Sequence, residues 1–390
     1  MFNPAGRHGA VTAQPAAGRR VLLDVRPLQS RDRMRGIGTY VRGLLNGLTE
    51  EGFDEHLGLL MDGREPLPDL PRGDFVAYAV RPRYHGRIAL VEEAVMMPRK
   101  LDRIGLGVYH ATGLTLPAGG RVPTVVTLHD LIPWALGGPA LRGERLRWWL
   151  GRRLLRQADV VIAVSRHTGD DAIRFAGVDP ATITVIPEAA SPVFAPRDGA
   201  AERVRSSLGV DGPFLLYVGA LDVRKDPPGL LRAWEVVRAE GLDVPLVLAG
   251  DPGPQAPREM PGTVRAGQVE IERLADLYSA AACFLYPSRY EGFGLPPLEA
   301  MACGCPVVTY RNSSLPAVVG KGAMLVDDGD AAALGRAAAA ILRNPGLADR
   351  LRHAGLARAR AFSWRRTARE TIRVYEQLLG SGGAGRAPPS

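Results

Sequence analysis

Two glutamates in a stretch rich in glycine and proline form the part of the sequence best suited to chemistry. Glu291 and Glu299 lie eight positions apart, and Gly292 and Gly294 follow the first of them. The glycines open a backbone cradle whose N–H groups can hold phosphate, and the prolines that come next start a helix whose positive end points at that cradle. The two carboxylates can accept hydrogen bonds from sugar and ribose hydroxyls. A hydrolase pair, or a simple helix charge at Glu299, would leave the same pattern.

A basic pair stands out because lysine is rare in this chain. Arg224 and Lys225 are adjacent, and Lys225 is one of only three lysines. The pair lies between an apolar run that ends before Gly219 and a segment in which prolines start a helix. Two cations after a buried strand concentrate positive charge where a polyphosphate can be held. Ordinary surface charge is the alternative interpretation.

The N-terminal half holds weaker candidates. His129 and Asp130 follow an apolar run. The histidine can donate to a sugar hydroxyl or shuttle a proton, and the aspartate can orient it or act as a base, although a turn-capping aspartate beside a structural histidine fits equally. Gly36 and Gly38 lead into a predicted helix and can bring its N-terminus close to phosphate, whereas alone they also suit a flexible loop. His110 follows another apolar run, but its small neighbours favour packing over chemistry.

Short β-branched runs that alternate with amphipathic segments must position these residues, and this alternation is typical of βα units and parallel sheets. The helices predicted in the first half lie near 39–50, 88–101, 141–157 and 167–176. The predicted strands are 21–25, 57–61, 75–80, 108–111, 124–128, 160–164 and 183–186 in the first half, and 214–218, 245–249, 283–286, 306–309 and 324–326 in the second.

The alternation indicates an α/β protein with two doubly wound, Rossmann-like domains. Open parallel sheets bind ligands at the carboxyl ends of their strands, which is where the candidate residues lie. We expect an N-terminal domain at 20–195 and a C-terminal domain at 200–362, which face each other across a cleft. Residues 1–19 and 380–390 have the composition of disordered tails.

Composition narrows the functional class. The 390 residues are 46% hydrophobic and 23% charged, which is usual for a globular protein, and no apolar run is long enough to span a bilayer. Three cysteines exclude a disulfide framework and a four-cysteine zinc site. The formal charge of +8 indicates an anionic partner, but an arginine-rich composition from a GC-rich genome would look the same. The first 19 residues lack the apolar core of a secretory signal, so we expect a cytoplasmic protein.

These motifs resemble a known family. Glu291 and Glu299 match the E-x7-E motif of retaining nucleotide-sugar glycosyltransferases with the GT-B fold, and the stretch around them closely resembles glycosyltransferase family 4, also described as glycosyl transferases group 1. The resemblance runs in order from about residue 20 to 379. It extends to Gly36-Ile37-Gly38, His129-Asp130, Val164-Ser165, Val218-Gly219 with Arg224-Lys225, and Pro306-Val307-Val308.

The resemblance implies that the domain at 20–195 is the acceptor side and that the domain at 200–362 binds the nucleotide sugar, and it implies a role for each matched residue. In the family the E-x7-E loop binds the donor, so Glu291 would lie near the sugar hydroxyls and Glu299 at the ribose. Arg224 and Lys225 would neutralise the pyrophosphate, and His129 would lie near the transferred sugar. The implied donor-binding residues are Gly36, Gly38, Gly219, Arg224, Lys225, Gly292, Phe293, Gly294, Leu295 and Glu299, and the implied catalytic residues are His129, Glu291 and Asp130.

The resemblance also implies a reaction. A hexose would pass with retention from a nucleotide sugar to a glycan or lipid-linked acceptor, in the synthesis of a surface polysaccharide or glycoconjugate. Fixed cations and helix ends can stabilise the departing diphosphate, so we expect no metal and no cofactor. GDP-mannose is the first expectation for the donor. A C-terminal helix at about 364–379 would cross back onto the N-terminal domain.

The chain departs from the family pattern at two places. Family members commonly have Pro-Glu where this chain has Pro316-Ala317, which puts fine specificity in doubt. The segment 251–263 is short and rich in proline where a helix is expected, which would reshape the rim of a base pocket with its floor at 267–269.

Two other classes of function fit part of the sequence. A catalytically weak nucleotide-sugar binder or partner subunit is supported only by Ala317, and the intact Glu291 and Lys225 argue against it. A nucleic-acid binder would interleave basic and aromatic residues on one face, but aromatic residues make up only 6% of this chain, so we expect no nucleic-acid partner.

A basic predicted helix at 141–156 suggests a membrane contact. It carries six arginines against one glutamate, and Leu146, Leu150 and Leu154 share one face. That face can pack into the domain core, but Trp148 and Trp149 cannot both point the same way. Tryptophan among arginines suits the headgroup layer of an anionic membrane. We therefore expect peripheral contact at the inner face of the membrane, where a lipid-linked acceptor would be found.

Overall fold

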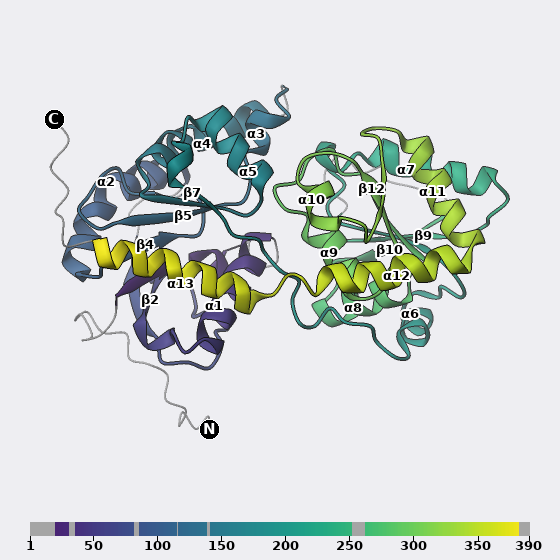
Figure 1. Ribbon diagram of the computed structural model, residues 1–390, viewed down its shortest axis with the longest axis horizontal. Coiled ribbons are helices and arrows are strands. Elements are labelled where there is room, and N and C mark those ends of the chain that lie inside the picture. The colour runs from purple at the N-terminus through teal and green to yellow at the C-terminus, as the bar shows by residue number, and fades with distance from the viewer. Residues whose placement is uncertain are drawn as a thin grey trace. The chain divides into compact units, whose positions relative to one another are not determined.

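The computed structural model describes residues 20–30, 36–81, 86–114, 116–138, 141–251 and 262–381. The chain forms two compact units (Figure 1). Unit 1 comprises the chain up to Pro187 together with the segment from Trp364 onward, and unit 2 runs from Glu188 to Ser363. The first boundary between the units, after Pro187, therefore lies earlier than residue 195, where the sequence predicts the end of the N-terminal domain. Within the described ranges, no helix is long and apolar enough to cross a bilayer.

Unit 1 contains a seven-stranded parallel sheet with the order β3-β2-β1-β4-β5-β6-β7. The chain builds outward from β1 to β3 and then returns to the other side of β1, so the topological switch point lies between β1 and β4. The residues of β1, β4 and β5 are all buried, as expected for strands covered on both faces. The strands are β1 (Val21–Asp24), β2 (Leu57–Asp62), β3 (Val76–Val80), β4 (Val108–Ala111), β5 (Thr124–Leu128), β6 (Val160–Ala163) and β7 (Ile183–Val185).

The helices of unit 1 form layers against this sheet. Ala94 and Met97 of the second helix and Leu154 of the fourth pack into one core with the strands, while the first and last helices pack against each other. The helices are α1 (Gly36–Glu50), α2 (Gly86–Ile104), α3 (Ile132–Ala135), α4 (Arg142–Leu154), α5 (Arg166–Asp171), which a π turn at Ala172–Ala176 extends, and α13 (Trp364–Ser381).

Glycines of α1 allow the C-terminal helix α13 to approach closely. A Cβ atom added at Gly43 would lie 2.1 Å from the Trp364 ring, and one at Gly47 would lie 2.4 Å from the Trp364 carbonyl oxygen. At the far end of α1, Arg365 and Arg369 both donate to the Glu51 carboxylate. The end of the described chain is therefore a packed layer of unit 1.

Unit 2 contains a six-stranded parallel sheet with the order β10-β9-β8-β11-β12-β13, and its switch point lies between β8 and β11. The strands are β8 (Leu215–Val218), β9 (Leu246–Ala249), β10 (Thr263–Gly267), β11 (Cys283–Tyr286), β12 (Val307–Tyr310) and β13 (Met324–Val326). The helices are α6 (Ala200–Leu208), α7 (Pro227–Ala239), α8 (Ile271–Ala280), α9 (Leu295–Ala302), α10 (Leu315–Val319), α11 (Ala331–Arg343) and α12 (Pro345–Ala359).

The structure corrects three local predictions. The helix expected from residue 39 begins at Gly36, so the two candidate glycines lie in its first turn. Strand β10 is absent from the prediction because it is an edge strand, partly exposed, with the polar residues Thr263 and Arg265 in its short run. The leucine face of α4 is only partly buried, since Leu154 is 6% exposed but Leu146 is 63% exposed.

We predict that Gly47→Ala destabilises the protein, because the new methyl group would meet the backbone of α13 and force the two helices apart. The expected loss in the free energy of unfolding is about 1–3 kcal/mol, measured by denaturant titration. Gly143→Ala is the matched control, since nothing lies within 4 Å of its added Cβ on α4. Equal stability of the Gly47 and Gly143 variants would contradict the close packing.

Candidate functional site

The carboxyl ends of β8 and β11 bring together the charged residues of unit 2. The loop after β8 leads to Gly219, Arg224 and Lys225, and the loop after β11 leads to Glu291. The two loops are joined by a hydrogen bond of 2.8 Å from the Arg289 N–H to the Arg224 carbonyl oxygen. The site therefore forms at the switch point, where open α/β sheets bind their ligands.

Two aspartates hold the basic pair in place. Asp222 caps the short 3-10 helix Val223–Lys225 by accepting from the Lys225 N–H at 3.2 Å. Asp226 takes a left-handed conformation, with φ of 50°, and caps α7 by accepting from the Gly229 N–H at 3.1 Å. Because both flanking turns are capped, Lys225 is held inward and is 5% exposed.

Glu291 neutralises part of this positive charge. Its Oε1 accepts from Lys225 Nζ at 2.5 Å, from Arg224 Nη1 at 2.7 Å, from the Tyr286 hydroxyl at 2.8 Å and from the Ser288 hydroxyl at 2.5 Å. Burial alone would raise the pKa of Glu291, but Arg224 and Lys225 outweigh it and hold this pKa at about 2. Glu291 is therefore an ionised, buried carboxylate.

The geometry of Glu291 leaves a role for its second oxygen. All four of these donors, from the described part of the chain, reach Oε1. Oε2 is thus the oxygen that can accept from a ligand hydroxyl.

Lys225 also has a shifted pKa. Its burial, together with Arg224, lowers this pKa to about 8, and Glu291 opposes the effect. Lys225 is therefore a cation below that pH.

Glu299, the second glutamate of the pair, is buried in a less polar environment. It lies in the second turn of α9 and accepts from the Tyr278 hydroxyl at 3.3 Å through Oε2. Burial raises its pKa to about 7, and the nearby Glu188 adds to this effect while Tyr278 opposes it. Glu299 therefore changes its charge near neutral pH, whereas Glu291 does not.

The glycine-rich loop between the two glutamates is held by serines. The Ser314 hydroxyl donates to the Phe293 carbonyl oxygen at 2.6 Å, and the Ser313 hydroxyl accepts from the Glu291 N–H at 2.9 Å. Gly294 has a φ of 109°, and a Cβ atom there would lie 2.9 Å from Leu315. Gly292, Phe293 and Leu295 are buried beside it. The loop therefore holds one conformation at the N-terminus of α9.

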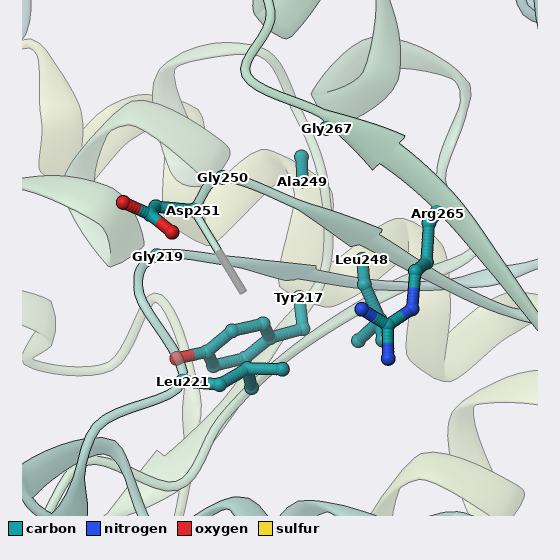
Figure 2. Close-up of a pocket in the computed structure, with 9 residues that line it drawn as sticks. All are labelled: Tyr217, Gly219, Leu221, Leu248, Ala249, Gly250, Asp251, Arg265 and Gly267. Atoms are coloured by element: carbon teal, nitrogen blue, oxygen red, sulfur yellow. The ribbon is translucent and has the colours of Figure 1, made fainter. Parts of the chain in front are cut away.

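A cavity of about 130 Å³ lies at the carboxyl ends of β8, β9 and β10 (Figure 2). Tyr217 and Leu221 lie together on one side of it, and Asp251 and Arg265 lie on opposite sides of its rim. Gly267, which the sequence assigns to the floor of a base pocket, is among the lining residues. The full lining is Tyr217, Gly219, Leu221, Leu248, Ala249, Gly250, Asp251, Arg265 and Gly267.

The remaining predicted residues lie in unit 1. His129 follows β5, where its Nε2 donates to the Thr112 carbonyl oxygen at 3.2 Å and its ring meets the edge of Tyr40 with centroids 4.8 Å apart. Asp130 Oδ1 accepts from the Ile132 N–H at 3.1 Å, which is a turn cap ahead of α3. In α1, Gly36 lies one turn before Tyr40 and Gly38 lies two residues before it. The structure thus brings Tyr40 of α1 to His129, and both belong to unit 1, whereas the charged cluster belongs to unit 2.

Sequence reasoning missed the polar residues that support the charged ones. Tyr286 ends β11, Ser288 follows it, and Tyr278 comes from α8. A tyrosine at the end of a buried apolar strand was the available signal for Tyr286. Tyr278 carries no comparable signal, because its contact with Glu299 depends on how α8 packs.

The acidic residues that the structure describes do not gather around a metal position. Within the described ranges, no group of three or more His, Cys, Asp or Glu side chains is arranged to hold a metal ion. An Asp-x-Asp sequence does occur at Asp328 and Asp330. Asp328 pairs with Arg289 at 3.2 Å, and Asp330 caps α11 by accepting from the Ala333 N–H at 2.8 Å.

Two Rossmann-like units, one with a cationic site at its switch point, define a nucleotide-binding class of α/β protein, and comparison with known proteins identifies the family. Residues 34–192 match the family described as Glycosyltransferase Family 4, and residues 212–344 match that described as Glycosyl transferases group 1. The alpha-maltose-1-phosphate synthase of Mycolicibacterium smegmatis is 33% identical, over 66% of this chain and 73% of that protein. This chain therefore belongs to glycosyltransferase family 4.

Two further similarities concern a longer relative and a solved structure. The serotype-specific mannosyltransferase WbdA of Escherichia coli is 27% identical over 93% of this chain, which spans only 48% of that protein, about half its length. The crystal structure of Anabaena HepE in complex with UDP-glucose has a TM-score of 0.70 at 15% identity, and the match covers 92% of this chain and 99% of that one. The fold is that of the GT-B glycosyltransferases.

We predict that Glu299 makes the protein less stable as the pH rises. The pKa of Glu299 in the folded protein is about 7, against an ordinary 4.5 in the unfolded chain, so stability falls as the pH rises through this interval and stays lower above it. Glu299→Gln removes this loss, which amounts to about 3 kcal/mol for a fully buried group. The measurement is the free energy of unfolding of both proteins between pH 5 and pH 8 (a window of about three pH units).

The exposed Glu235 on α7 provides the control for this measurement, because Glu235→Gln removes a carboxylate that faces solvent. If the Glu299 variant loses stability with pH in parallel with the wild type and with the Glu235 variant, the carboxyl group of Glu299 titrates normally and the prediction is wrong.

Proposed function

We propose that this chain is a retaining, metal-independent glycosyltransferase that moves a hexose from a nucleotide sugar to a glycan or lipid-linked acceptor. The observation that carries the proposal is the cluster of Arg224, Lys225 and Glu291 at the switch point of unit 2. Both cations pair with Glu291, and Arg224 also lies 3.9 Å from Asp222 Oδ2, in the loops that lead to α7 and α9. A diphosphate fits such a site, since the two basic side chains and the positive end of the α9 dipole favour an anion.

The chemistry required of these residues is electrostatic. As the bond from the anomeric carbon to the diphosphate breaks, negative charge grows on the leaving oxygen and positive charge on the carbon. Arg224 and Lys225 stabilise the negative charge on the leaving oxygen. Oε2 of Glu291 accepts from a sugar hydroxyl near the positively charged carbon. The acceptor hydroxyl attacks from the face that the diphosphate leaves, and its proton passes to a phosphate oxygen, so the configuration is retained. His129 and Asp130 contribute from unit 1 by binding the transferred sugar.

The cavity beside Gly219 is the candidate for the nucleobase. It is adjacent to the charged cluster, because a Cβ at Gly219 would lie 3.7 Å from Lys225 Cε, and Gly219 itself lines the cavity. GDP-mannose is the first donor to test, since the relative WbdA is named a mannosyltransferase. UDP-glucose is the second, because it occupies the similar structure of Anabaena HepE.

We predict that Lys225→Met and Glu291→Gln each reduce transfer by about 30- to 1000-fold, which corresponds to losing a transition-state contact of about 2–4 kcal/mol. Glutamine is chosen at position 291 because it keeps the size of the side chain and an accepting oxygen and removes only the charge. The measurement is release of nucleoside diphosphate from a panel of nucleotide sugars, in buffer containing EDTA, with and without acceptor.

The control is Lys321→Met, which removes one of the other lysines from an exposed position in the same unit. A second check is pH: donor affinity should fall as the pH rises above about 8, where Lys225 loses its charge. Wild-type rates in both site variants would place the reaction elsewhere. Thermal protection by a nucleotide sugar without any turnover would favour a catalytically weak binder or partner subunit, and loss of turnover in EDTA would refute metal independence.

We propose in addition that unit 1 contacts an anionic membrane through α4. Leu146 and Trp149 are 63% and 47% exposed, and the Arg153 guanidinium lies 4.8 Å from the centre of the Trp149 ring. Val91 and Val95 of α2, a helix that packs into the same core, are each 53% exposed. The exposed apolar and basic side chains of α4 suit the headgroup layer, where a lipid-linked acceptor would be presented.

We predict that the protein sediments with vesicles containing anionic lipid, and that this binding fades as salt rises because each basic residue contributes about 1 kcal/mol at low salt. Leu146→Ser/Trp149→Ser should weaken binding. Leu67→Ser, at a position 65% exposed on a loop, is the matched control and should not. Arg152 is unsuitable for a charge reversal because it donates to the Phe175 carbonyl oxygen at 2.6 Å. Equal recovery with anionic and neutral vesicles would refute the contact.

A further inference from the structure

Residues that take no part in sugar transfer hold His129 from within unit 1. The edge contact with Tyr40 has an interplanar angle of 82°, and the bond to the Thr112 carbonyl oxygen fixes one ring nitrogen. Together these two contacts define both the plane of the imidazole and its rotation. Whatever fixes Tyr40 therefore also fixes His129.

A chain of hydrogen bonds fixes Tyr40. Its hydroxyl lies 2.8 Å from Thr127 Oγ1, which lies 2.8 Å from His110 Nε2. The other ring nitrogen of His110, Nδ1, lies 2.6 Å from the Tyr375 hydroxyl. All four side chains are fully buried. They come from α1, β5, β4 and α13, so the chain runs from the C-terminal helix through two central strands to the helix that contacts His129.

The neutral state of His110 makes this chain of hydrogen bonds rigid. Burial lowers the pKa of His110 to about 3, so the ring is neutral and carries a single N–H. One ring nitrogen must then donate and the other accept, which commits the hydroxyls on both sides. A fully satisfied buried network of this kind holds its members in one arrangement.

The polar character of these four side chains argues against a role in core packing alone. Apolar residues could fill this core, and burying four polar side chains is unfavourable unless each one is hydrogen-bonded. Trp364 adds a direct contact, since its ring meets Tyr40 edge-on with centroids 5.8 Å apart. Trp364 is the first residue of the segment that returns from unit 2 to unit 1. The C-terminal helix thus reaches Tyr40 twice, once through Trp364 and once through Tyr375.

We propose that α13 sets the orientation of His129 through Tyr375, His110, Thr127 and Tyr40, which makes Tyr40 and Tyr375 positioning residues. The consequence for catalysis rests on the proposed function, in which His129 contacts the transferred sugar. The orientation of the ring is independent of that function and can be observed directly.

The test uses the full chain labelled with ¹³C and ¹⁵N histidine, and the NMR signals of His129 are identified by their loss in His129→Gln. Tyr375→Phe is the decisive variant, because it removes one hydroxyl from a residue that contacts His110 and leaves the Tyr40 ring in place. We expect the His129 ring signals to shift in Tyr375→Phe and in Tyr40→Phe. We also expect turnover to fall about tenfold with an unchanged KM for the donor, since misplacing a catalytic group lowers the rate rather than donor binding.

Leu48→Ala is the control for a general loosening of the core of unit 1. Leu48 is a fully buried residue of α1 that takes no part in the chain of hydrogen bonds. It should lower the melting temperature and leave the His129 signals in place. The proposal is overturned if Tyr375→Phe does not shift those signals, or if Leu48→Ala shifts them equally. If the signals shift while Tyr375→Phe and His129→Gln both turn over at the wild-type rate, the orienting chain is supported and the catalytic role of His129 fails.

Discussion

One carboxylate oxygen organises the ligand-binding edge of unit 2. Oε1 of Glu291 accepts from two cations and two hydroxyls that arrive on two different loops. Arg224 and Lys225 are adjacent in the chain, and Lys225 is almost fully buried. Without a nearby anion the two cations would repel each other, and burying the Lys225 charge would carry a high desolvation cost. That constraint accounts for the shape of the surrounding turns, including the left-handed Asp226 that closes the loop after β8.

The two units hold their central residues by different physical means. In unit 2 the interaction is ionic: a carboxylate with a pKa of about 2 faces a lysine whose pKa is lowered to about 8. Arg224 also lies 3.9 Å from Asp222 Oδ2, so each of the two cations has a carboxylate beside it. In unit 1 the contacts given for the His129 ring, with the Tyr40 ring and the Thr112 carbonyl oxygen, are with uncharged groups, which give direction and rigidity.

Most of the architecture was predictable because every strand except β10 is a short apolar run, and because His129, Gly219 and the loops that hold Arg224 and Glu291 follow such runs. What the sequence could not reveal are contacts between distant residues. Lys225 and Glu291 are 66 positions apart, and His110 and Tyr375 are 265 apart. His110 was correctly predicted to pack, since its small neighbours indicate burial, but nothing near it indicates a hydroxyl partner on the last helix. Strand β10 escaped prediction because an edge strand needs less apolar surface than a central one.

The discontinuity of unit 1 has a consequence for protein synthesis. Unit 2 is continuous from Glu188 to Ser363, whereas unit 1 takes its last layer from residues that follow all of unit 2. On the ribosome, which adds roughly 5–20 residues per second, unit 2 is complete before α13 has been made. During that interval the glycine face of α1 and Nδ1 of His110 lack the helix that contacts them. Unit 1 therefore reaches its final packing after unit 2, although its first strand emerges before any other part of the fold.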